Sequence, residues 1–392
     1  SLARALEYAQ VAMPLYGFAR ALYDGICMTF LTLLDPPSRN VMENLIFSQL
    51  MKKIGVDPKT KSLLAKVPSQ PSHNHVQFEH FWLEKGDVEA SELCLEFTQR
   101  YVVTQSRREH LQNIAKAVFI RKYPVLLQGP TSSGKTSLIE YLAIVTCHRF
   151  VRINNHEHTD LQEYLGSYVT GSSGKLVFQE GILVEAVRNG YWIVLDELNL
   201  APSEVLEALN RLLDDNRELF VPELQIVIKP HPHFMLFATQ NPPGAYGGRK
   251  VLSRAFRNRF LELHVDDIPE NELCSILEKR CEVPKSYADK MVAVMIDLQR
   301  NRQTSQAFAG KHGFITPRDL FRWADRHRKD GISYEDLAKV GYVLLAERLR
   351  ESNERQIVME SLEKNLRVKI DISMLYAEVS QHTTYILSFL FP

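Results

Sequence analysis

The pattern of apolar and polar positions changes character near residue 123. Beyond it, short apolar runs alternate with stretches of helical spacing, and the runs cover residues 125–127, 150–153, 192–195, 234–238 and 261–265. Buried strands that alternate with helices are typical of a largely parallel sheet covered on both faces. After about residue 270 the strand-like runs stop and several helices are expected up to residue 366. The sequence therefore predicts an α/β domain followed by a helical domain.

The part before residue 123 has a different pattern. Residues 1–56 carry apolar positions at helical spacing, and Pro36-Pro37 interrupts them. Residues 57–75 are polar with three prolines, which favours a linker. Residues 75–82 alternate as an edge strand does, and residues 105–118 favour a helix. Because Ser1 already lies inside a helical pattern, we expect the sequence to be a piece of a longer chain.

These patterns divide the 392 residues into four parts. We expect a helical segment over 1–56, a linker and lead-in segment over 57–100, the α/β domain over 101–269, and a helical domain with a C-terminal tail over 270–392. No structure is assigned to the apolar end of that tail, which shows no period.

Residues 129–136 match the phosphate-loop pattern G-x-x-x-x-G-K-[ST] in full, between a strand-like run and a helical pattern. Glycines allow successive N–H groups to converge on phosphate oxygens, and the helix start adds its dipole. We predict that Lys135 contacts the β- and γ-phosphates of ATP and that Thr136 offers its hydroxyl to Mg²⁺. A chance Gly/Ser-rich turn is the alternative. The predicted loop is Gly129, Pro130, Thr131, Ser132, Ser133, Gly134, Lys135 and Thr136.

Two acids end the apolar run at 192–195. A buried parallel strand delivers its carboxyl end to the ligand edge of the sheet, so Asp196 and Glu197 are predicted there. Asp196 can hold Mg²⁺ together with Thr136, and Glu197 can orient and polarise the attacking water. Adjacent carboxylates repel each other without a cation, which itself favours Mg²⁺. The alternative is a surface Asp-Glu pair that caps the next helix.

Asn241 follows the next apolar run and is polar but uncharged. This suits a residue between the γ-phosphate and the catalytic water, and the alternative is an ordinary Asn-Pro turn.

A further polar group, His156-Glu157-His158, lacks zinc-ligand spacing, so we interpret it as a polar loop near the nucleotide rather than a metal site.

Five cations lie within eleven residues: Arg249, Lys250, Arg254, Arg257 and Arg259. They could form a solvated helix face, a nucleic-acid patch, or an arginine finger that reaches the ATP of a neighbouring subunit. A finger stabilises charge on the transferred phosphoryl group and is worth about 10³–10⁵ in rate. We favour this role for Arg257 or Arg259, which precede the last predicted strand. Nucleic acid ranks third because no aromatic residues are interleaved.

Another arginine lies in the helical domain, where Thr316-Pro317-Arg318-Asp319 is predicted to open a helix with a capping box. Arg318 would then be fixed at the helix start and could point toward a phosphate. The alternative is a capped helix with a surface arginine.

Composition changes this picture mainly by exclusion. Lys+Arg and Asp+Glu both number 47, so no overall basic field would draw the chain to nucleic acid or an anionic membrane. No apolar run approaches the roughly 20 residues that span a bilayer, and we recognise no signal peptide. The five scattered cysteines favour reduced thiols. We therefore expect no membrane partner and no direct sequence-specific binding of nucleic acid.

The phosphate loop, Asp196-Glu197, Asn241 and the arginines, in this order, resemble the AAA+ ATPases. Two predicted hairpins, one within 160–190 and one within 219–228, are similar to insertions of the dynein, MoxR and midasin branch. Within this branch the sequence resembles the midasin family, on segments 128–136, 152–160, 195–199, 238–243 and 311–318. The complete module resembles the third of that family's six, and residues 1–56 resemble the lid helices of a preceding unit.

The resemblance implies more than the motifs do. Members of the midasin family carry six AAA+ units in one chain and close a ring without oligomerisation, so neighbouring units of the same chain would be partners. Their function is the ATP-driven removal of assembly factors from precursors of the large ribosomal subunit. An ATPase that uses ATP and Mg²⁺ and meets pre-ribosomal particles in the nucleus, in nucleolus and nucleoplasm, is thus implied.

Other functions stay open. The chain could be a structural or regulatory module that binds nucleotide without turnover, a MoxR-like chaperone ATPase, or a DNA-linked motor. The presence of Lys135, Glu197 and Asn241 favours hydrolysis. A finger for this site would come from a neighbouring unit.

Overall fold

The computed structural model describes residues 2–54, 66–88, 92–170, 174–242, 250–304, 308, 315–326 and 333–372. It forms two compact units, residues 1–267 and residues 268–392, which are described separately. Arg249, residues 311–314 and most of the C-terminal tail lie outside the described residues.

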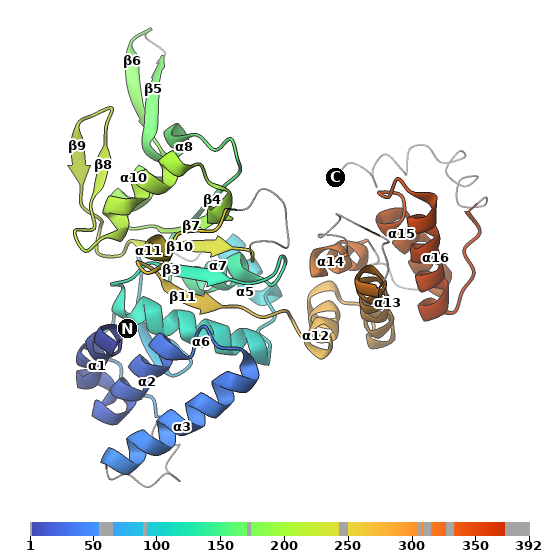
Figure 1. Cartoon of the computed structure of the whole chain (residues 1–392), viewed down its shortest axis with the longest axis horizontal. Coiled ribbons are helices and arrows are strands. Elements are labelled where there is room, and N and C mark those ends of the chain that lie inside the picture. The colour runs from blue at the N-terminus through green and yellow to red at the C-terminus, as the bar shows by residue number, and fades with distance from the viewer. Residues whose placement is uncertain are drawn as a thin grey trace. The chain divides into compact units, whose positions relative to one another are not determined.

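Unit 1 is built around a five-stranded parallel sheet in the order β11-β3-β10-β7-β4 (Figure 1). The strands are β3 (Val125–Gln128), β4 (Phe150–Asn154), β7 (Trp192–Asp196), β10 (Met235–Gln240) and β11 (Leu261–His264). Every residue of β7 and β10 is buried, as expected for strands covered on both faces. The predicted α/β fold with a parallel sheet is confirmed.

Helices cover both faces of this sheet, and the side chains of each strand alternate between them. Val125 and Leu127 of β3 pack with α6 (Gln105–Ile120) and α7 (Lys135–Val145). Leu126 packs on the opposite face, with α9 (Ile182–Asn189) and α10 (Ser203–Leu213). A short helix, α5 (Glu92–Arg100), contacts α7. The sheet is therefore the middle layer of three.

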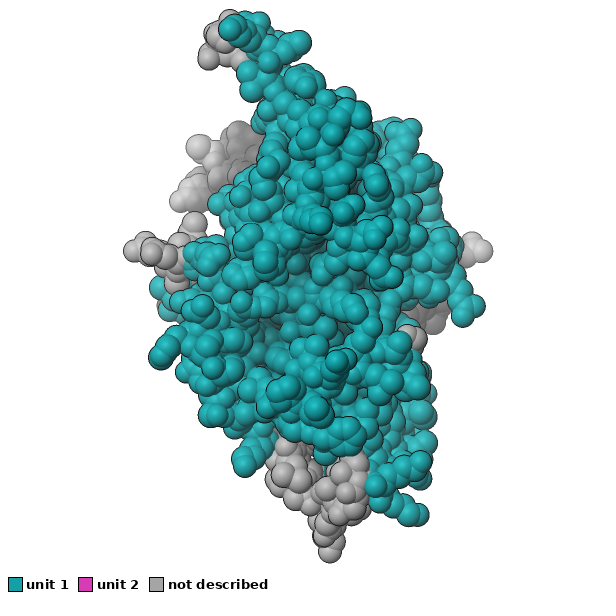
Figure 2. Space-filling view, turned by 90° about the vertical axis from the view of Figure 1, so that its left-hand side faces the viewer, with its two compact units in different colours: residues 1–267 teal, residues 268–392 magenta. Residues whose placement is uncertain are grey.

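Both inserted hairpins that the sequence predicts are present. The first, β5 (Gly166–Thr170) with β6 (Leu176–Glu180), follows the short helix α8 (Leu161–Leu165) and projects from the compact body of unit 1 (Figure 2). The second is β8 (Leu219–Val221) with β9 (Ile226–Ile228).

The prediction of a single edge strand over residues 75–82 is wrong. The segment is a hairpin of β1 (His75–Phe78) and β2 (Phe81–Glu84). Glu79 adopts a left-handed backbone with φ 51°, which turns the chain back on itself. Two consecutive polar residues, Glu79 and His80, interrupt the apolar alternation at this turn, and an assignment of one strand across them overlooks it.

The N-terminal helices also belong to unit 1. They are α1 (Leu2–Tyr16), α2 (Phe18–Phe30) and α3 (Pro36–Ile54). Pro36 begins α3, consistent with the interruption that the sequence predicts there. Tyr8, Ala12 and Met28 are buried in the same apolar cluster as β3 and β11. Helices α1 and α2 are thus packed against the α/β layer, and α3 packs on α2 through Phe47.

Unit 2 is helical, as predicted. Its described helices share one apolar core and are α12 (Glu270–Cys281), α13 (Lys285–Thr304), α14 (Pro317–Asp325), α15 (Tyr334–Leu345) and α16 (Ser352–Leu366). Trp323 is fully buried and donates its indole N–H to Leu337 O at 3.0 Å. Among the described residues of the chain, no helix has the length and apolar character to cross a membrane.

Candidate nucleotide-binding and hydrolysis site

The phosphate loop joins the carboxyl end of β3 to the start of α7. Gly134 adopts φ 80°, a backbone that disfavours any side chain. A Cβ at Gly129 would lie 2.1 Å from Val265 O, so only glycine fits this close approach. The loop is therefore shaped by its two glycines at the edge of the sheet where β7 and β10 also end.

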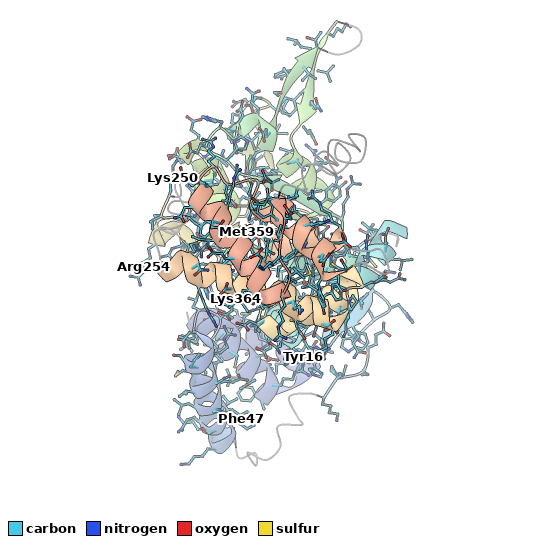
Figure 3. All side chains as sticks on the ribbon, turned by 90° about the vertical axis from the view of Figure 1, so that its right-hand side faces the viewer. Tyr16, Phe47, Lys250, Arg254, Met359 and Lys364 are labelled. Carbon is cyan, nitrogen blue, oxygen red and sulfur yellow. The ribbon has the colours of Figure 1, made fainter. Side chains whose placement is uncertain are left out.

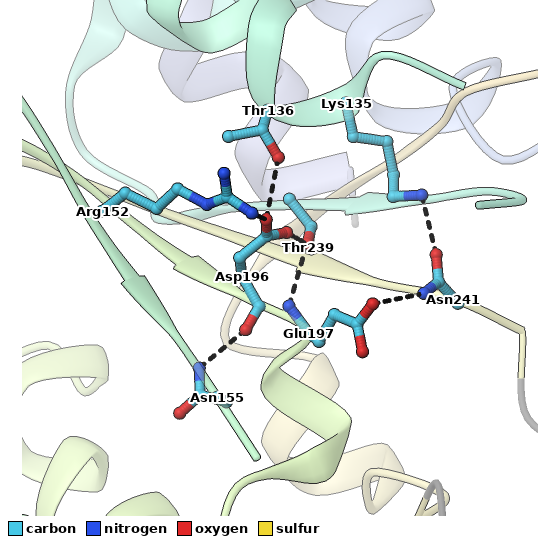
Figure 4. Close-up of polar contacts among 8 residues, drawn as sticks. All are labelled: Lys135, Thr136, Arg152, Asn155, Asp196, Glu197, Thr239 and Asn241. Carbon is cyan, nitrogen blue, oxygen red and sulfur yellow. Dashed lines mark hydrogen bonds and ion pairs between the residues drawn. The ribbon is translucent and has the colours of Figure 1, made fainter. Parts of the chain in front are cut away.

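Lys135 is 7% exposed, and its ammonium lies inside the loop. Its Nζ donates to Gly129 O at 2.9 Å and to Pro130 O at 2.7 Å. It also donates to the side-chain oxygen of Asn241 at 2.9 Å (Figure 4). The loop lysine and the residue after β10 are therefore in direct contact.

The Asp196 carboxylate is the meeting point of several donors (Figure 4). Thr136 Oγ1 donates to Asp196 Oδ2 at 3.1 Å, and the Thr239 hydroxyl donates to Oδ1. The guanidinium of Arg152 forms an ion pair with Oδ2. Asn155 Nδ2 donates to the main-chain oxygen of Asp196 at 2.9 Å. The structure therefore fixes both the side chain and the backbone of this acid.

Glu197 follows Asp196 and has a left-handed backbone with φ 52°. Its N–H donates to Thr239 Oγ1 at 3.1 Å. Its Oε1 accepts a hydrogen bond from Asn241 Nδ2 at 3.2 Å. The turn in the backbone separates the two adjacent carboxyl groups, so that Asp196 faces Thr136 while Glu197 faces Asn241.

Asn241 is 3% exposed, and its side-chain oxygen and nitrogen each form a hydrogen bond, with Lys135 and Glu197 respectively. Its main-chain oxygen accepts from Asn199 Nδ2 at 3.1 Å, which ties it to the 3-10 helix η1 (Leu198–Leu200) after β7. Lys135, Asn241 and Glu197 thus form one continuous hydrogen-bonded chain, which the sequence indicated only as three separate positions.

Several residues of this cluster are missing from the sequence-based candidates. Thr239 and Asn155 stand at the carboxyl ends of β10 and β4, so the strand-end argument that located Asp196 could have found them. Arg107 on α6 donates to Ser133 O and, at 3.0 Å, to Asp266 O. Burial raises the pKa of the nearby Asp267, and the charge of Arg107 opposes this rise.

The side chains at the loop can be compared with the donors that ATP phosphates need and the oxygen ligands that Mg²⁺ needs. The hydroxyls of Thr131 and Ser133 are buried in the loop, and neither finds a hydrogen-bond partner among the described residues. Thr136 and Asp196 supply neighbouring oxygen ligands of the kind that Mg²⁺ prefers. A lysine ammonium and orphaned loop hydroxyls are donors for phosphate oxygens. The residues therefore fit both groups.

The clustered arginines lie at the amino ends of the strands, just before β11, whereas the phosphate loop lies at their carboxyl ends. Arg257 pairs with Glu262 at 3.5 Å, and Arg259 Nε with Asp214 Oδ1 at 2.5 Å. Arg254 begins the short helix α11 (Arg254–Arg257) and has an exposed side chain (Figure 3). The structure does not bring these arginines to Lys135. A role at a neighbour's nucleotide stays a prediction.

Arg318 lies in unit 2, at the exposed start of α14. The predicted capping box is present, since the Thr316 side chain accepts from the backbone of Asp319 and Asp319 Oδ2 accepts from Thr316 N at 2.8 Å. Asp319 Oδ1 also accepts from Arg348 at 2.8 Å. The role of Arg318 at a phosphate stays a prediction.

Residues 156–158 lie between β4 and α8, and no group of three or more His, Cys, Asp or Glu suited to a metal occurs in the described part of the chain.

Family models match most of the chain. The AAA domain of the dynein-related subfamily matches residues 124–260. Two models described as Midasin AAA lid domain match residues 272–369 and residues 1–53.

Individual relatives agree with these matches. The chain is 59% identical to Midasin of Dictyostelium discoideum over 96% of its length, and 39% identical to Midasin of Giardia intestinalis over 94%. It spans only 6% and 8% of those two proteins. An uncharacterized protein of Staphylococcus aureus is 29% identical over 64% of the chain, and the match takes in 94% of that protein.

Proposed function

Because this chain belongs to the AAA ATPase family, as a dynein-related AAA domain with lids of the midasin type, we propose that it binds ATP with Mg²⁺ and hydrolyses ATP as one module of a longer chain. The observation that carries the proposal is the hydrogen-bonded chain from Lys135 through Asn241 to Glu197. It links a phosphate-binding cation to a carboxylate that can accept a proton from water.

Each residue has a distinct role in this proposal. The loop N–H groups and Lys135 bind the phosphates, and Thr136 with Asp196 would hold the metal. Mg²⁺, when bound, neutralises charge on phosphate oxygens. Glu197 orients the attacking water and accepts its proton, while Asn241 keeps the carboxylate of Glu197 in place. Asp196, which faces Thr136, would take the metal, and Glu197, which faces Asn241, would take the water.

The site is proposed to be shared between modules. Arg257 or Arg259 would stabilise charge at the nucleotide of a neighbouring unit, and Arg318 would approach a phosphate from a lid. The separation of the arginines from Lys135, at opposite ends of the strands, supports this division.

Nucleotide binding and turnover by the intact long chain test the proposal. Lys135→Ala removes the ammonium that sits among the loop carbonyls, so the affinity for ATP at this module should fall by about 10²-fold or more. Lys85→Ala, on an exposed segment remote from the loop, is the control and should bind as the wild type does. Equal ATP affinity in both variants would refute the assignment of the loop.

A module that binds nucleotide without turnover is the second candidate. The ion pair of Arg152 with Asp196 favours it, because a cation already lies at the carboxylate assigned to Mg²⁺. The two candidates differ in what the Glu197 carboxylate does, and Glu197→Gln distinguishes them.

The client is proposed from the similarity to the two Midasins. We propose that ATP turnover here contributes to removing assembly factors from precursors of the large ribosomal subunit, in the nucleolus and nucleoplasm. Cells in which the long chain carries Lys135→Ala should accumulate such precursors with their assembly factors attached. The tagged protein should be found in the nucleus. Normal precursor composition in these cells would contradict the proposal.

A further inference from the structure

Arg4 of α1 contacts the main chain on both sides of Arg259. Its NH1 donates to Phe260 O at 2.7 Å, and its NH2 donates to Asn258 O. These two carbonyls flank Arg259 in the sequence but are about 254 and 256 positions away from Arg4. One guanidinium therefore brackets the backbone of one of the candidate finger arginines.

The helix that carries Arg4 is itself anchored. The Arg4 guanidinium lies over the Tyr123 ring, 4.6 Å from its centroid. One turn further along, Glu7 accepts from the Tyr123 hydroxyl and pairs with Lys122 at 3.0 Å. Tyr8 is fully buried in the core of the α/β layer. Arg4 therefore donates to these carbonyls from a helix that is itself packed into the core of unit 1.

The side chain of Arg259, in contrast, keeps some freedom. It is 30% exposed and pairs with Asp214, which is 45% exposed. Arg4, Asp214, Asn258 and Arg259 all line a cavity of about 480 Å³. The side chain can therefore leave Asp214 and enter this space while its backbone stays fixed by Arg4.

We propose that Arg4 is a positioning residue that fixes the backbone of Arg259, so that the lid segment at residues 1–53 sets where this arginine meets the nucleotide of a neighbouring module. The inference rests on the proposed role of Arg259 as an arginine finger. It adds that the finger's position is determined by a helix that the family model assigns to a lid. A movement of that lid is then transmitted directly to the arginine.

Arginine suits this role because its planar fork donates to two carbonyls at once. A lysine keeps the charge and can still lie near Tyr123, but its compact ammonium does not reproduce the bidentate geometry. Arg4→Lys therefore tests the bracket with little change in charge.

The experiment uses the intact long chain. The part of ATP turnover that depends on Arg259 is the difference between the wild type and Arg259→Ala. Arg4→Lys should reduce the kcat of that part by about tenfold and leave its KM unchanged, since a misplaced group loses rate rather than substrate affinity. Arg4→Gln should act in the same direction. Arg100→Lys, an exposed arginine on α5, is the control and should leave turnover unchanged.

The double variant separates positioning from a structural role. If Arg4 acts through Arg259, Arg4→Lys with Arg259→Ala should turn over ATP as Arg259→Ala alone does. A further loss in the double variant, or wild-type turnover in both Arg4 variants, would overturn the proposal. If Arg259→Ala itself has no effect, the finger role fails together with the bracket, whereas the ATP site stands or falls with Lys135→Ala.

Discussion

Asn241 donates one hydrogen bond to the Glu197 carboxylate, with 3.2 Å between Nδ2 and Oε1. The direction of this bond is fixed from the other side. An ammonium can only donate, so Lys135 requires the side-chain oxygen of Asn241 to face it and leaves the amide nitrogen for Glu197. Asn241 is therefore a polar connector with one allowed orientation.

Replacing this connector by aspartate should change both rate and pH dependence. Asn241→Asp can still accept from Lys135, but it places a second carboxylate next to Glu197 and removes the donor. Like charges raise the apparent pKa of such a pair, so the acid limb of the pH–rate profile should move to higher pH. We expect kcat to fall by about 10²-fold. Asn241→Ala should also lose rate but without the shift, and identical profiles for the two variants would contradict this account.

Glu197→Gln should separate binding from hydrolysis. The amide keeps the size of the side chain and removes its ability to accept a proton. ATP affinity should stay within about twofold, while turnover at this module falls by about 10²–10⁴-fold. Glu204→Gln, an exposed glutamate at the start of α10, is the matched control. Single-turnover hydrolysis with stoichiometric ATP measures the step. Unchanged turnover in Glu197→Gln would refute the assignment of Glu197 as the base, whereas no hydrolysis at this module even in the wild type would support a site that only binds nucleotide.

Arg152→Gln should alter the response to Mg²⁺. The variant leaves the mostly buried Asp196 carboxylate without its paired cation, so the thermal midpoint in the absence of metal should fall by a few degrees. Added Mg²⁺ should then raise the midpoint more than in the wild type, because no arginine competes for the same oxygens. Arg149→Gln, an exposed neighbour just before β4, should show neither effect. Equal Mg²⁺ responses in all three proteins would exclude Asp196 as a metal ligand.

His148 should make the folded state sensitive to acid. Burial, with smaller contributions from His233 and Arg121, lowers its pKa from 6.5 to about 3. Between these values the unfolded chain binds a proton that the folded chain does not. Stability is therefore complete above pH 6.5 and is lost as the pH falls toward 3. The midpoint should drop by about 2–4 °C for each kcal/mol lost.

His148→Phe provides the check on that window. Phenylalanine can keep the stacking on Trp192, where the ring centroids are 4.6 Å apart, and cannot titrate. The decrease in thermal midpoint between neutral pH and pH 5 should be smaller in the variant. Some decrease should persist, because burial also lowers the pKa of His110 to about 3. An unchanged pH dependence would show that His148 is solvated in the folded protein.

The 392-residue chain on its own should bind ATP but turn it over slowly. Its arginines lie at the amino ends of the strands and Lys135 lies at their carboxyl ends, so a monomer lacks a finger for its own site. Turnover should be at least about 10³-fold below that of the same module in the long chain. Fast hydrolysis by verified monomers, measured alongside sedimentation, would rule out a finger supplied by a neighbour.

The sequence predicts those parts of the site that are local or that end a buried strand. Lys135 belongs to a contiguous motif, while Asp196 and Asn241 follow apolar runs whose carboxyl ends must share an edge. The pair of Arg152 with Asp196 depends instead on which strand lies beside β7, and strand order cannot be deduced from the runs alone. Likewise, the contact of Arg4 with Phe260 joins residues 256 positions apart. A left-handed residue, Glu79, turns one predicted strand into a hairpin at the point where two polar residues interrupt the apolar alternation.

The backbone of Glu197 has a consequence for how this protein can change over generations. A residue with a Cβ at φ 52° is held there at a cost of about 1–2 kcal/mol, and glycine would relieve it. A chain that no longer needed this carboxylate would thus gain stability by losing it. Under the role proposed for Glu197, substitution by glycine would thus exchange hydrolysis for a more relaxed backbone at this position.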